Sequence, residues 1–249
     1  MNLKGKNVLI TGGAKRIGRE IALAAAQKGA NVLLHCSESE REASALCRKI
    51  ESLGVKADFF KCDFAQHGGS GLAGSIQKAF RSAEKSFGPV HVLINNASAY
   101  YPTALGSVTE KAWDELMAVN LKAPFFLAQE AGRKMLKRRQ GKIINLADWA
   151  LARPRRSFLP YTASKAGLVS MTLSLAVDLA PHVEVNAVAP GPILSAAGAT
   201  PSANAKVIQQ TLLKRFGKPS DIARAVLFLI ANDFVTGTVL PVDGGASIA

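Results

Sequence analysis

Short apolar runs alternate with helix-length stretches along the chain, and this alternation constrains the fold more than any other feature of the sequence. The first run, residues 7–11, ends in the turn TGGAKRIG, after which a helical pattern extends from Ile17 to Gly29. Further apolar runs follow at similar spacing: ANVLLHC, ADFFKCD, VHVLINNAS, GKIINLA, HVEVNAVAPG and TGTVLPVDGG. Strands connected through helices form right-handed crossovers, which place neighbouring strands parallel. The alternation predicts an α/β protein with a doubly wound parallel sheet of about seven strands, flanked by helices.

We expect a single domain over residues 1–249, because the chain has no linker, internal repeat or shift in composition. Within this domain, a long helix over residues 109–139 is expected to bend near Pro124, because proline has no amide hydrogen. The last helix is expected to open at the cap signal Ser220–Asp221.

Two segments carry little apolar pattern. The glycine-rich residues 67–71 are expected to form a loose start of a helix. Residues 194–206 are rich in Ala, Ser and Pro, and we expect them to form a mobile lid that decides which substrate is accepted.

Charge balance and cysteine usage exclude several classes of protein. The 31 basic and 18 acidic residues give a formal net charge of +13, but no aromatic residues interleave with the basic cluster at residues 133–142, so we expect no nucleic-acid partner. No run approaches the ~20 apolar residues of a membrane span, and no signal peptide is expected. The three scattered cysteines fit a reducing cytoplasm. The histidines are dispersed, so we expect no metal site.

Tyr161 and Lys165 lie four residues apart near the start of a helical run, and residues at this spacing share one helix face. A cation beside a phenol favours its ionised form, so we expect Lys165 to lower the pKa of Tyr161 toward working pH. A tyrosine tuned in this way can act as a general acid. Taken alone, the same spacing also fits an ordinary half-exposed helix face.

Three motifs in order carry a resemblance to a known family. TGGAKRIG follows the first strand and opens the first helix, NNA follows the fourth strand, and the Tyr161 and Lys165 pair comes later. Together they resemble the short-chain dehydrogenase/reductase family over essentially the whole chain. The resemblance implies a Rossmann-type fold, a nicotinamide cofactor and a homotetramer. It implies cofactor contacts at Thr11, Gly12, Lys15, Arg16, Ile17, Gly18, Ser37, Asp63, Asn95, Asn96, Ala97, Tyr161, Lys165, Pro190, Gly191 and Ile193.

The resemblance also implies roles for particular residues. Gly12 and Gly18 would let the backbone approach the cofactor phosphates at a helix N-terminus. Asp63 would hold the adenine ring, and Lys165 would hold the nicotinamide ribose. Asn120 would position a water of the proton relay, and so joins the catalytic set.

Two departures from the family pattern are informative. Arg16 stands where the turn has its middle glycine, and Asp148, thirteen residues before Tyr161, stands where the common pattern has serine. With the segment NNASAYYPT, these departures resemble pteridine reductases. That resemblance implies a catalytic set of Asp148, Tyr161, Lys165 and Asn120, and substrate contacts at Arg16, Ser98, Tyr100, Asp148 and Tyr161.

The chemistry of a carboxylate favours the same reading of Asp148. An ionised carboxylate only accepts hydrogen bonds and repels the oxyanion formed when a ketone is reduced, whereas a serine hydroxyl donates to it. A pterin presents N–H donors, and its C=N bonds need a proton as well as a hydride. The alternative is that Asp148 simply caps the loop after the fifth strand.

The cofactor is expected to be NADPH, with NADH left open. Lys15 and Arg16 are two cations suited to a 2′-phosphate. Cys36 ends the second strand, where an NAD-specific enzyme normally has an aspartate. Glu38 opposes this expectation, because a carboxylate there would repel a phosphate.

Three functions therefore follow from the sequence. The first is an NADPH-dependent reductase acting on a small, pterin-like substrate of unknown identity. The second is a short-chain carbonyl reductase, such as a 3-oxoacyl-[acyl carrier protein] reductase, with the basic stretches 133–139 and 153–156 docking an acidic carrier. The third is a non-catalytic NADP-binding regulator.

Overall fold

The structure is a computed structural model that describes residues 1–65, 71–195, 198 and 200–249. In this described part, one seven-stranded sheet has the order β3-β2-β1-β4-β5-β6-β7, and its neighbouring strands are parallel. The prediction of a doubly wound parallel sheet is confirmed. The strands are β1 (Asn7–Thr11), β2 (Asn31–Cys36), β3 (Ala57–Lys61), β4 (Val92–Asn95), β5 (Gly141–Leu146), β6 (Val183–Pro190) and β7 (Val239–Val242).

The strand order reverses at β1, which pairs with β2 on one side and with β4 on the other. Strands β1 and β5 are buried along their whole length, because helices cover both faces of the sheet. A reversal of this kind opens a crevice at the carboxyl ends of the strands, where ligands bind in open α/β sheets. The loops after β1, β2 and β4 therefore frame the candidate site.

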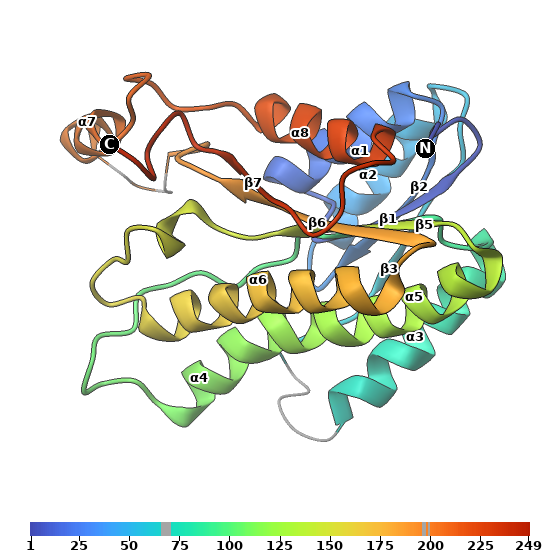
Figure 1. The fold of residues 1–249 in the computed structure, drawn as a ribbon, viewed down its shortest axis with the longest axis horizontal. Helices are drawn as coiled ribbons and strands as arrows, with labels where there is room; N and C mark the ends of the chain where they lie inside the picture. Colours follow the sequence, from blue (N-terminus) through green and yellow to red (C-terminus); the bar gives the residue numbers. More distant parts are fainter. Residues whose placement is uncertain (66–70, 196–197, 199) are drawn as a thin grey trace.

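Helices pack in two layers on opposite faces of the sheet (Figure 1). Strand β1 contributes to both cores in alternation, since Val8 and Ile10 pack in one and Leu9 in the other. None of the described helices is long and apolar enough to cross a bilayer. One layer consists of α1 (Arg16–Gln27), α2 (Glu40–Glu51) and α8 (Pro219–Ala231), and the other of α3 (Gly71–Phe87), α5 (Ala123–Arg138) and α6 (Leu159–Leu179).

The predicted long helix is interrupted one turn before Pro124. Helix α4 (Glu110–Met117) continues into a π-helical turn, Ala118–Lys122, which leads directly into α5. Proline cannot donate to the carbonyl four residues earlier, here that of Asn120, and its ring crowds that carbonyl. The widened turn accommodates this conflict, and π-turns of this kind are frequent at functional sites.

Two other boundaries differ from expectation. Residues 201–206 of the expected lid lie in helix α7 (Pro201–Gln209), which Thr200 caps by accepting from the backbone N–H of Ala203 at 3.2 Å. Residues 196, 197 and 199 of that segment lie outside the described residues, as do residues 66–70, which hold most of the expected glycine-rich start of α3.

Helix α8 begins at Pro219, one residue before the predicted Ser220–Asp221 cap, so Ser220 is not the N-cap residue. Asp221 instead lies in the first turn and accepts from the backbone N–H of Lys218 at 2.8 Å. Proline favours the first helical position, because its missing amide hydrogen would have no partner there.

Candidate active site

The turn between β1 and α1 is built so that two glycines are required. Gly12 has a φ of +59°, and a Cβ on it would lie 3.0 Å from the Cα of Ala97. A Cβ on Gly18 would lie 2.4 Å from the carbonyl oxygen of Gly12, closer than atoms can approach. Arg16, at the position of the missing middle glycine, keeps the left-handed conformation with a φ of +52°. The arginine therefore adopts a backbone conformation that glycine adopts more readily, and it adds an exposed cation to the turn.

The segment after β4 is bound tightly to this turn. The hydroxyl of Thr11 accepts from the backbone N–H groups of Asn96 (2.9 Å) and Ala97 (3.0 Å). The side-chain amide of Asn96 donates to the carbonyls of Thr11 and Gly12. Asn95 points elsewhere, because its amide donates to Asn145 of β5 inside the core at 2.8 Å. Thr11 and Asn96 therefore shape the crevice, and the side chain of Asn95 does not face it.

Asp148 and Tyr161 are in direct contact. The Tyr161 hydroxyl donates to one carboxylate oxygen of Asp148 at 2.5 Å, and the other oxygen accepts from the N–H of Ala150 at 2.7 Å. Asp148 is thus both the cap of the loop after β5 and a hydrogen-bond partner of the tyrosine. Burial and the Asp148 charge raise the pKa of Tyr161 above its ordinary value.

Lys165 acts differently from expectation. Its ammonium donates to the backbone carbonyl of Leu146 at 2.7 Å and lies 6.0 Å from the centre of the Tyr161 ring. Burial lowers the pKa of Lys165 to about 8, an effect that the Asp148 charge opposes. The prediction that Lys165 lowers the pKa of Tyr161 was wrong, because the carboxylate is nearer to the phenol and burial penalises the phenolate.

Asn120 is fully buried in the π-helical turn and connects the segment after β4 to α6. Its carbonyl oxygen accepts from the Ser98 hydroxyl (3.1 Å) and the Ala99 N–H (2.9 Å). Its amide donates to the hydroxyl of Ser164 (3.1 Å), which itself donates to the backbone carbonyl of Tyr161 (2.7 Å). Sequence reasoning missed Ser164, although its spacing of three from Tyr161 places it on the same helix face.

Aromatic side chains surround the tyrosine at the mouth of the site. The ring of Tyr100 stacks on Phe158 (centroids 4.8 Å apart) and meets Tyr161 edge-on at the same distance. The guanidinium of Arg155 donates to the Tyr100 hydroxyl at 3.3 Å and lies 5.0 Å from the ring of Trp149. Tyr100 is half-exposed, as a residue that meets a ligand must be. Phe158 was also missed, and no sequence signal distinguishes it from a packing residue.

Ion pairs occupy the edge of the crevice near β2. Lys15 pairs with Glu42 of α2 at 2.7 Å, while Ser37 and Glu38 are exposed just before that helix. Asp63 follows β3, and its carboxylate accepts from the N–H of Ala65 at 2.8 Å. The charge of Lys15 is therefore partly neutralised by Glu42. Arg16, the other cation of the turn, has no carboxylate partner among the ion pairs of the described residues.

The segment after β6 lies against β7. The N–H of Gly191 donates to the carbonyl of Val242, and a Cβ on Gly191 would lie 2.3 Å from the Cα of Asp243. Ile193 is buried, and Pro190 is the last residue of the strand. The close approach to Asp243 fixes this segment at the carboxyl edge of the sheet.

Comparison with known proteins identifies the family. A sequence model of the short chain dehydrogenases matches residues 6–206. The chain belongs to this family. A short-chain type dehydrogenase/reductase of Picea abies is 34% identical over 98% of this chain and 93% of the relative. A 3-oxoacyl-[acyl-carrier-protein] reductase of Staphylococcus epidermidis is 35% identical over 96% of this chain and 98% of its own length.

Two solved structures of similar sequence share the fold. A blue fluorescent protein from a metagenomic library, in complex with NADPH, has a TM-score of 0.89 at 33% identity and covers 99% of both chains. FolM alternative dihydrofolate reductase 1 from Brucella canis, complexed with NADP, has a TM-score of 0.89 at 30% identity and covers 100% of this chain and 97% of its own.

The glycine turn fits the dinucleotide that short-chain dehydrogenases use. Lys15, the N-cap residue of α1, makes no capping hydrogen bond with its side chain, so it leaves the first N–H groups of the helix available to an anion. Gly12 and Gly18 leave no side chain over these groups. Ile17 is half-buried and packs into the core beneath the turn. Backbone donors and the helix dipole together suit a pyrophosphate.

Proposed function

We propose that this short-chain dehydrogenase is an NADPH-dependent reductase that transfers hydride to a C=N bond of a pterin, of the dihydropteridine or dihydrofolate type. The observation that carries the proposal is the hydrogen bond between Tyr161 and Asp148 (2.5 Å), at a position where the common family pattern has serine. A carboxylate accepts hydrogen bonds and repels a developing oxyanion, which disfavours ketones. The ring N–H and amino groups of a pterin are donors that a carboxylate can bind.

The residues of the chain would supply the proton, and bound NADPH would supply the hydride. The nitrogen of a C=N bond would take the proton of the Tyr161 hydroxyl as hydride adds to the neighbouring carbon, so no negative charge builds up beside Asp148. An imine nitrogen is a stronger base than a carbonyl oxygen, so it tolerates the raised pKa of Tyr161 better than a ketone does. The charge of Arg155 would then stabilise the phenolate until water returns a proton.

The preference for NADPH rests on the turn. Gly12 and the first N–H groups of α1 would hold the pyrophosphate, and exposed Arg16 would neutralise the 2′-phosphate. Lys15 would contribute less, since Glu42 already pairs with it. Exposed Glu38 can turn toward solvent. The NADPH and NADP complexes of the two similar structures support the same choice.

The substrate pocket would use the aromatic mouth of the site. Phe158 stacks on one face of the Tyr100 ring, which meets the Tyr161 ring edge-on. A flat heterocycle would fit between Tyr100 and the nicotinamide, with Ser98 and Arg16 at its edges. FolM alternative dihydrofolate reductase 1, one of the similar structures, is named for reduction of a molecule of this shape.

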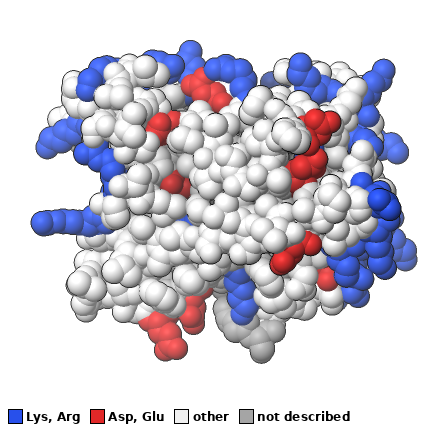
Figure 2. Space-filling view, in the orientation of Figure 1, with Lys and Arg blue, Asp and Glu red and all other residues white. Residues whose placement is uncertain are grey.

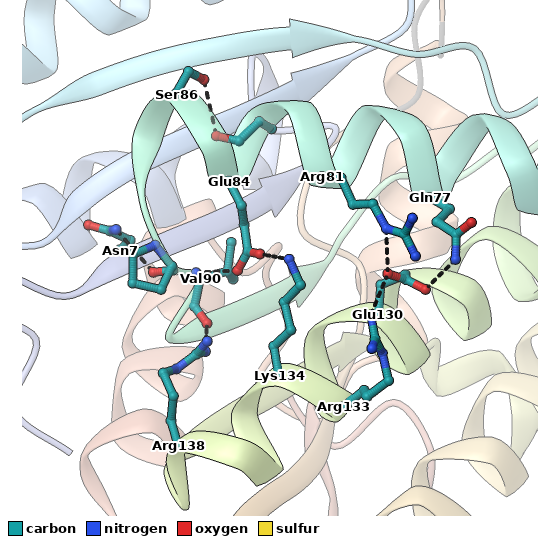
Figure 3. Close-up of polar contacts among 12 residues, drawn as sticks. Asn7, Gln77, Arg81, Glu84, Ser86, Val90, Glu130, Arg133, Lys134 and Arg138 are labelled. Atoms are coloured by element: carbon teal, nitrogen blue, oxygen red, sulfur yellow. Dashed lines mark hydrogen bonds and ion pairs between the residues drawn. The ribbon is translucent and has the colours of Figure 1, made fainter.

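A carbonyl reductase remains the second candidate, because the relative from Staphylococcus epidermidis is a 3-oxoacyl-[acyl-carrier-protein] reductase. Three of the five basic residues in the first of the two stretches expected to dock a carrier, residues 133–139, are engaged within the protein (Figure 3). Arg133 pairs with Glu130, Lys134 pairs with Glu84, and Arg138 donates to the carbonyl of Val90. Figure 2 shows Lys and Arg at the periphery of one face, whose middle is largely uncharged. These contacts weaken the case for a carrier-docking surface.

A non-catalytic regulator is the third candidate, and the buried site argues against it. Burial of the charged Lys165 costs stability, and Asn120 is held by three partners, so both arrangements suit catalysis better than cofactor sensing.

We also propose a homotetramer, supported by exposed apolar side chains on α5 and α6, namely Phe125, Leu173 and Val177. Light scattering of the purified protein tests the assembly.

The test is to follow loss of NADPH absorbance after adding dihydrobiopterin, dihydrofolate or an acetoacetyl thioester, and to repeat each assay with NADH. We expect turnover with a pterin and NADPH. The variant Asp148→Ser is expected to lose pterin turnover and to retain or gain thioester reduction. Turnover with the thioester alone, or the opposite response of Asp148→Ser, would refute the proposal and favour the carbonyl reductase.

A further inference from the structure

His35, near the end of β2, is a buried histidine that the mechanism above does not use. Its side chain is 2% exposed, and it lies beside Thr11 in the register of β1 and β2. It therefore lies at the carboxyl edge of the sheet, directly under the glycine turn. Buried polar side chains are costly unless hydrogen bonds satisfy them, so its two ring nitrogens indicate what it holds.

Both nitrogens of the His35 ring bind backbone groups on opposite sides. The N–H of Gly12 donates to Nδ1 at 3.3 Å, and Nε2 lies 2.7 Å from the carbonyl oxygen of Cys62. Because Nδ1 accepts, the ring proton must be on Nε2, which donates to Cys62. The backbone of His35 adds a further link, since its carbonyl accepts from the N–H of Gly13 at 3.2 Å.

Aromatic packing holds the His35 ring in this orientation. The ring stacks on Phe64, with ring centroids 4.1 Å apart and an interplanar angle of 9°. The centroid of the Phe60 ring lies 5.4 Å from that of His35. Burial lowers the pKa of His35 to about 4, while the Cys62 carbonyl and the Asp63 charge oppose this. The ring is therefore neutral at working pH, which the bond from Gly12 requires.

The two backbone segments that the ring joins flank one part of the cofactor site. Gly12 belongs to the turn that would hold the pyrophosphate, and Cys62 precedes Asp63, the residue expected beside the adenine. We propose that neutral His35 is a positioning residue that holds these two segments in register for the adenosine half of NADPH. This inference rests on the proposed NADPH-dependent function.

The test measures binding of NADPH and of 2′,5′-ADP to the full-length protein by fluorescence titration and competition. His35→Phe keeps the stacking on Phe64 and removes both hydrogen bonds, and we expect the Kd for both ligands to rise about tenfold or more. His35→Asn retains an acceptor near the position of Nδ1 for Gly12, so its Kd is expected to rise less. If His35→Phe does not fold, His35→Asn alone carries the comparison.

The control is His91→Phe. His91 also accepts a backbone N–H of β1 through Nδ1, that of Asn7 at 3.1 Å, but at the amino end of the sheet. Its substitution is expected to affect stability and to leave the Kd for NADPH unchanged. In steady-state assays, His35→Phe is expected to raise the KM for NADPH while kcat at saturating NADPH is retained.

The outcomes separate the two proposals. Weaker NADPH binding by His35→Phe but not by His91→Phe supports the positioning role. Equal Kd values for wild type and both His35 variants, or equal weakening by His91→Phe, overturn it. A wild-type protein that binds no NADPH overturns the proposed function together with this inference.

Discussion

Replacing Lys165 by methionine is expected to stabilise the folded protein while abolishing its activity. Lys165 is 3% exposed, and burial lowers its pKa to about 8 from the usual 10.5, against the opposing charge of Asp148. The folded state therefore holds this proton more weakly than the unfolded chain does. Methionine has a similar length and carries no charge, so it fills the same space without that cost.

The size of the effect follows from the two pKa values. The charged lysine lowers the free energy of unfolding by about 3 kcal/mol near pH 7. Between the two pKa values the unfolded chain binds more protons, so stability rises with pH there, and the cost falls to about 1.5 kcal/mol near pH 9.5. Losing the bond from Lys165 to Leu146 offsets about 1 kcal/mol of the gain. The expected net gain is about 2 kcal/mol near pH 7 and below about 1 kcal/mol near pH 9.5.

Urea denaturation of wild type and Lys165→Met at both pH values measures this difference. The contributions of the other titrating groups to the free energy of unfolding cancel when the two proteins are compared. The control is Lys142→Met. Lys142 is equally buried, but it donates to the carbonyl of Asn232 (2.6 Å) and lies 3.2 Å from a carboxylate oxygen of Glu184, so its removal leaves partners unpaired and is expected to destabilise. A Lys165→Met protein that is no more stable than wild type near pH 7, or whose gain is independent of pH, would show that burying the charged lysine does not cost stability.

Three further substitutions test the site and its supports. Asp148→Asn keeps the shape of the side chain but replaces a charge-assisted bond worth about 1.5–3 kcal/mol by a neutral one, so kcat/KM for a pterin is expected to fall about 10- to 150-fold and part of that energy is lost from the free energy of unfolding; an undiminished kcat/KM contradicts this. Arg16→Gly relieves the strain of an arginine in the left-handed backbone conformation, so it is expected to raise the free energy of unfolding by about 1 kcal/mol, as thermal unfolding measures. It also removes a cation, so NADPH titration is expected to show weaker binding. Gly191→Ala would place a Cβ 2.3 Å from the Cα of Asp243, so it is expected to lower the free energy of unfolding in urea by about 2 kcal/mol or more. The control is Gly74→Ala, whose Cβ would have no atom within 4 Å and is expected to cause no loss of stability.

The local pattern of the sequence was sufficient to predict the architecture. Strands that are apolar throughout must be buried on both faces, and here helices connect them. Few arrangements other than a doubly wound parallel sheet satisfy both conditions. The glycine turn was equally predictable, because a positive φ at Gly12 and the close approach at Gly18 exclude most other residues. Pro124 predicted an interruption of the long helix, but only the structure shows that this interruption is a π-helical turn, Ala118–Lys122.

The order and spacing of Asp148, Tyr161 and Lys165 were enough to predict which chemical groups the site contains. How these groups act on one another depends on the folded arrangement. Spacing suggested that Lys165 governs the pKa of Tyr161, but the folded chain places a carboxylate against the phenol and removes both groups from water. The link from His35 to Gly12 and Cys62 likewise arises only when three strands lie side by side. A pKa depends on distance and burial, and neither quantity exists until the chain has folded.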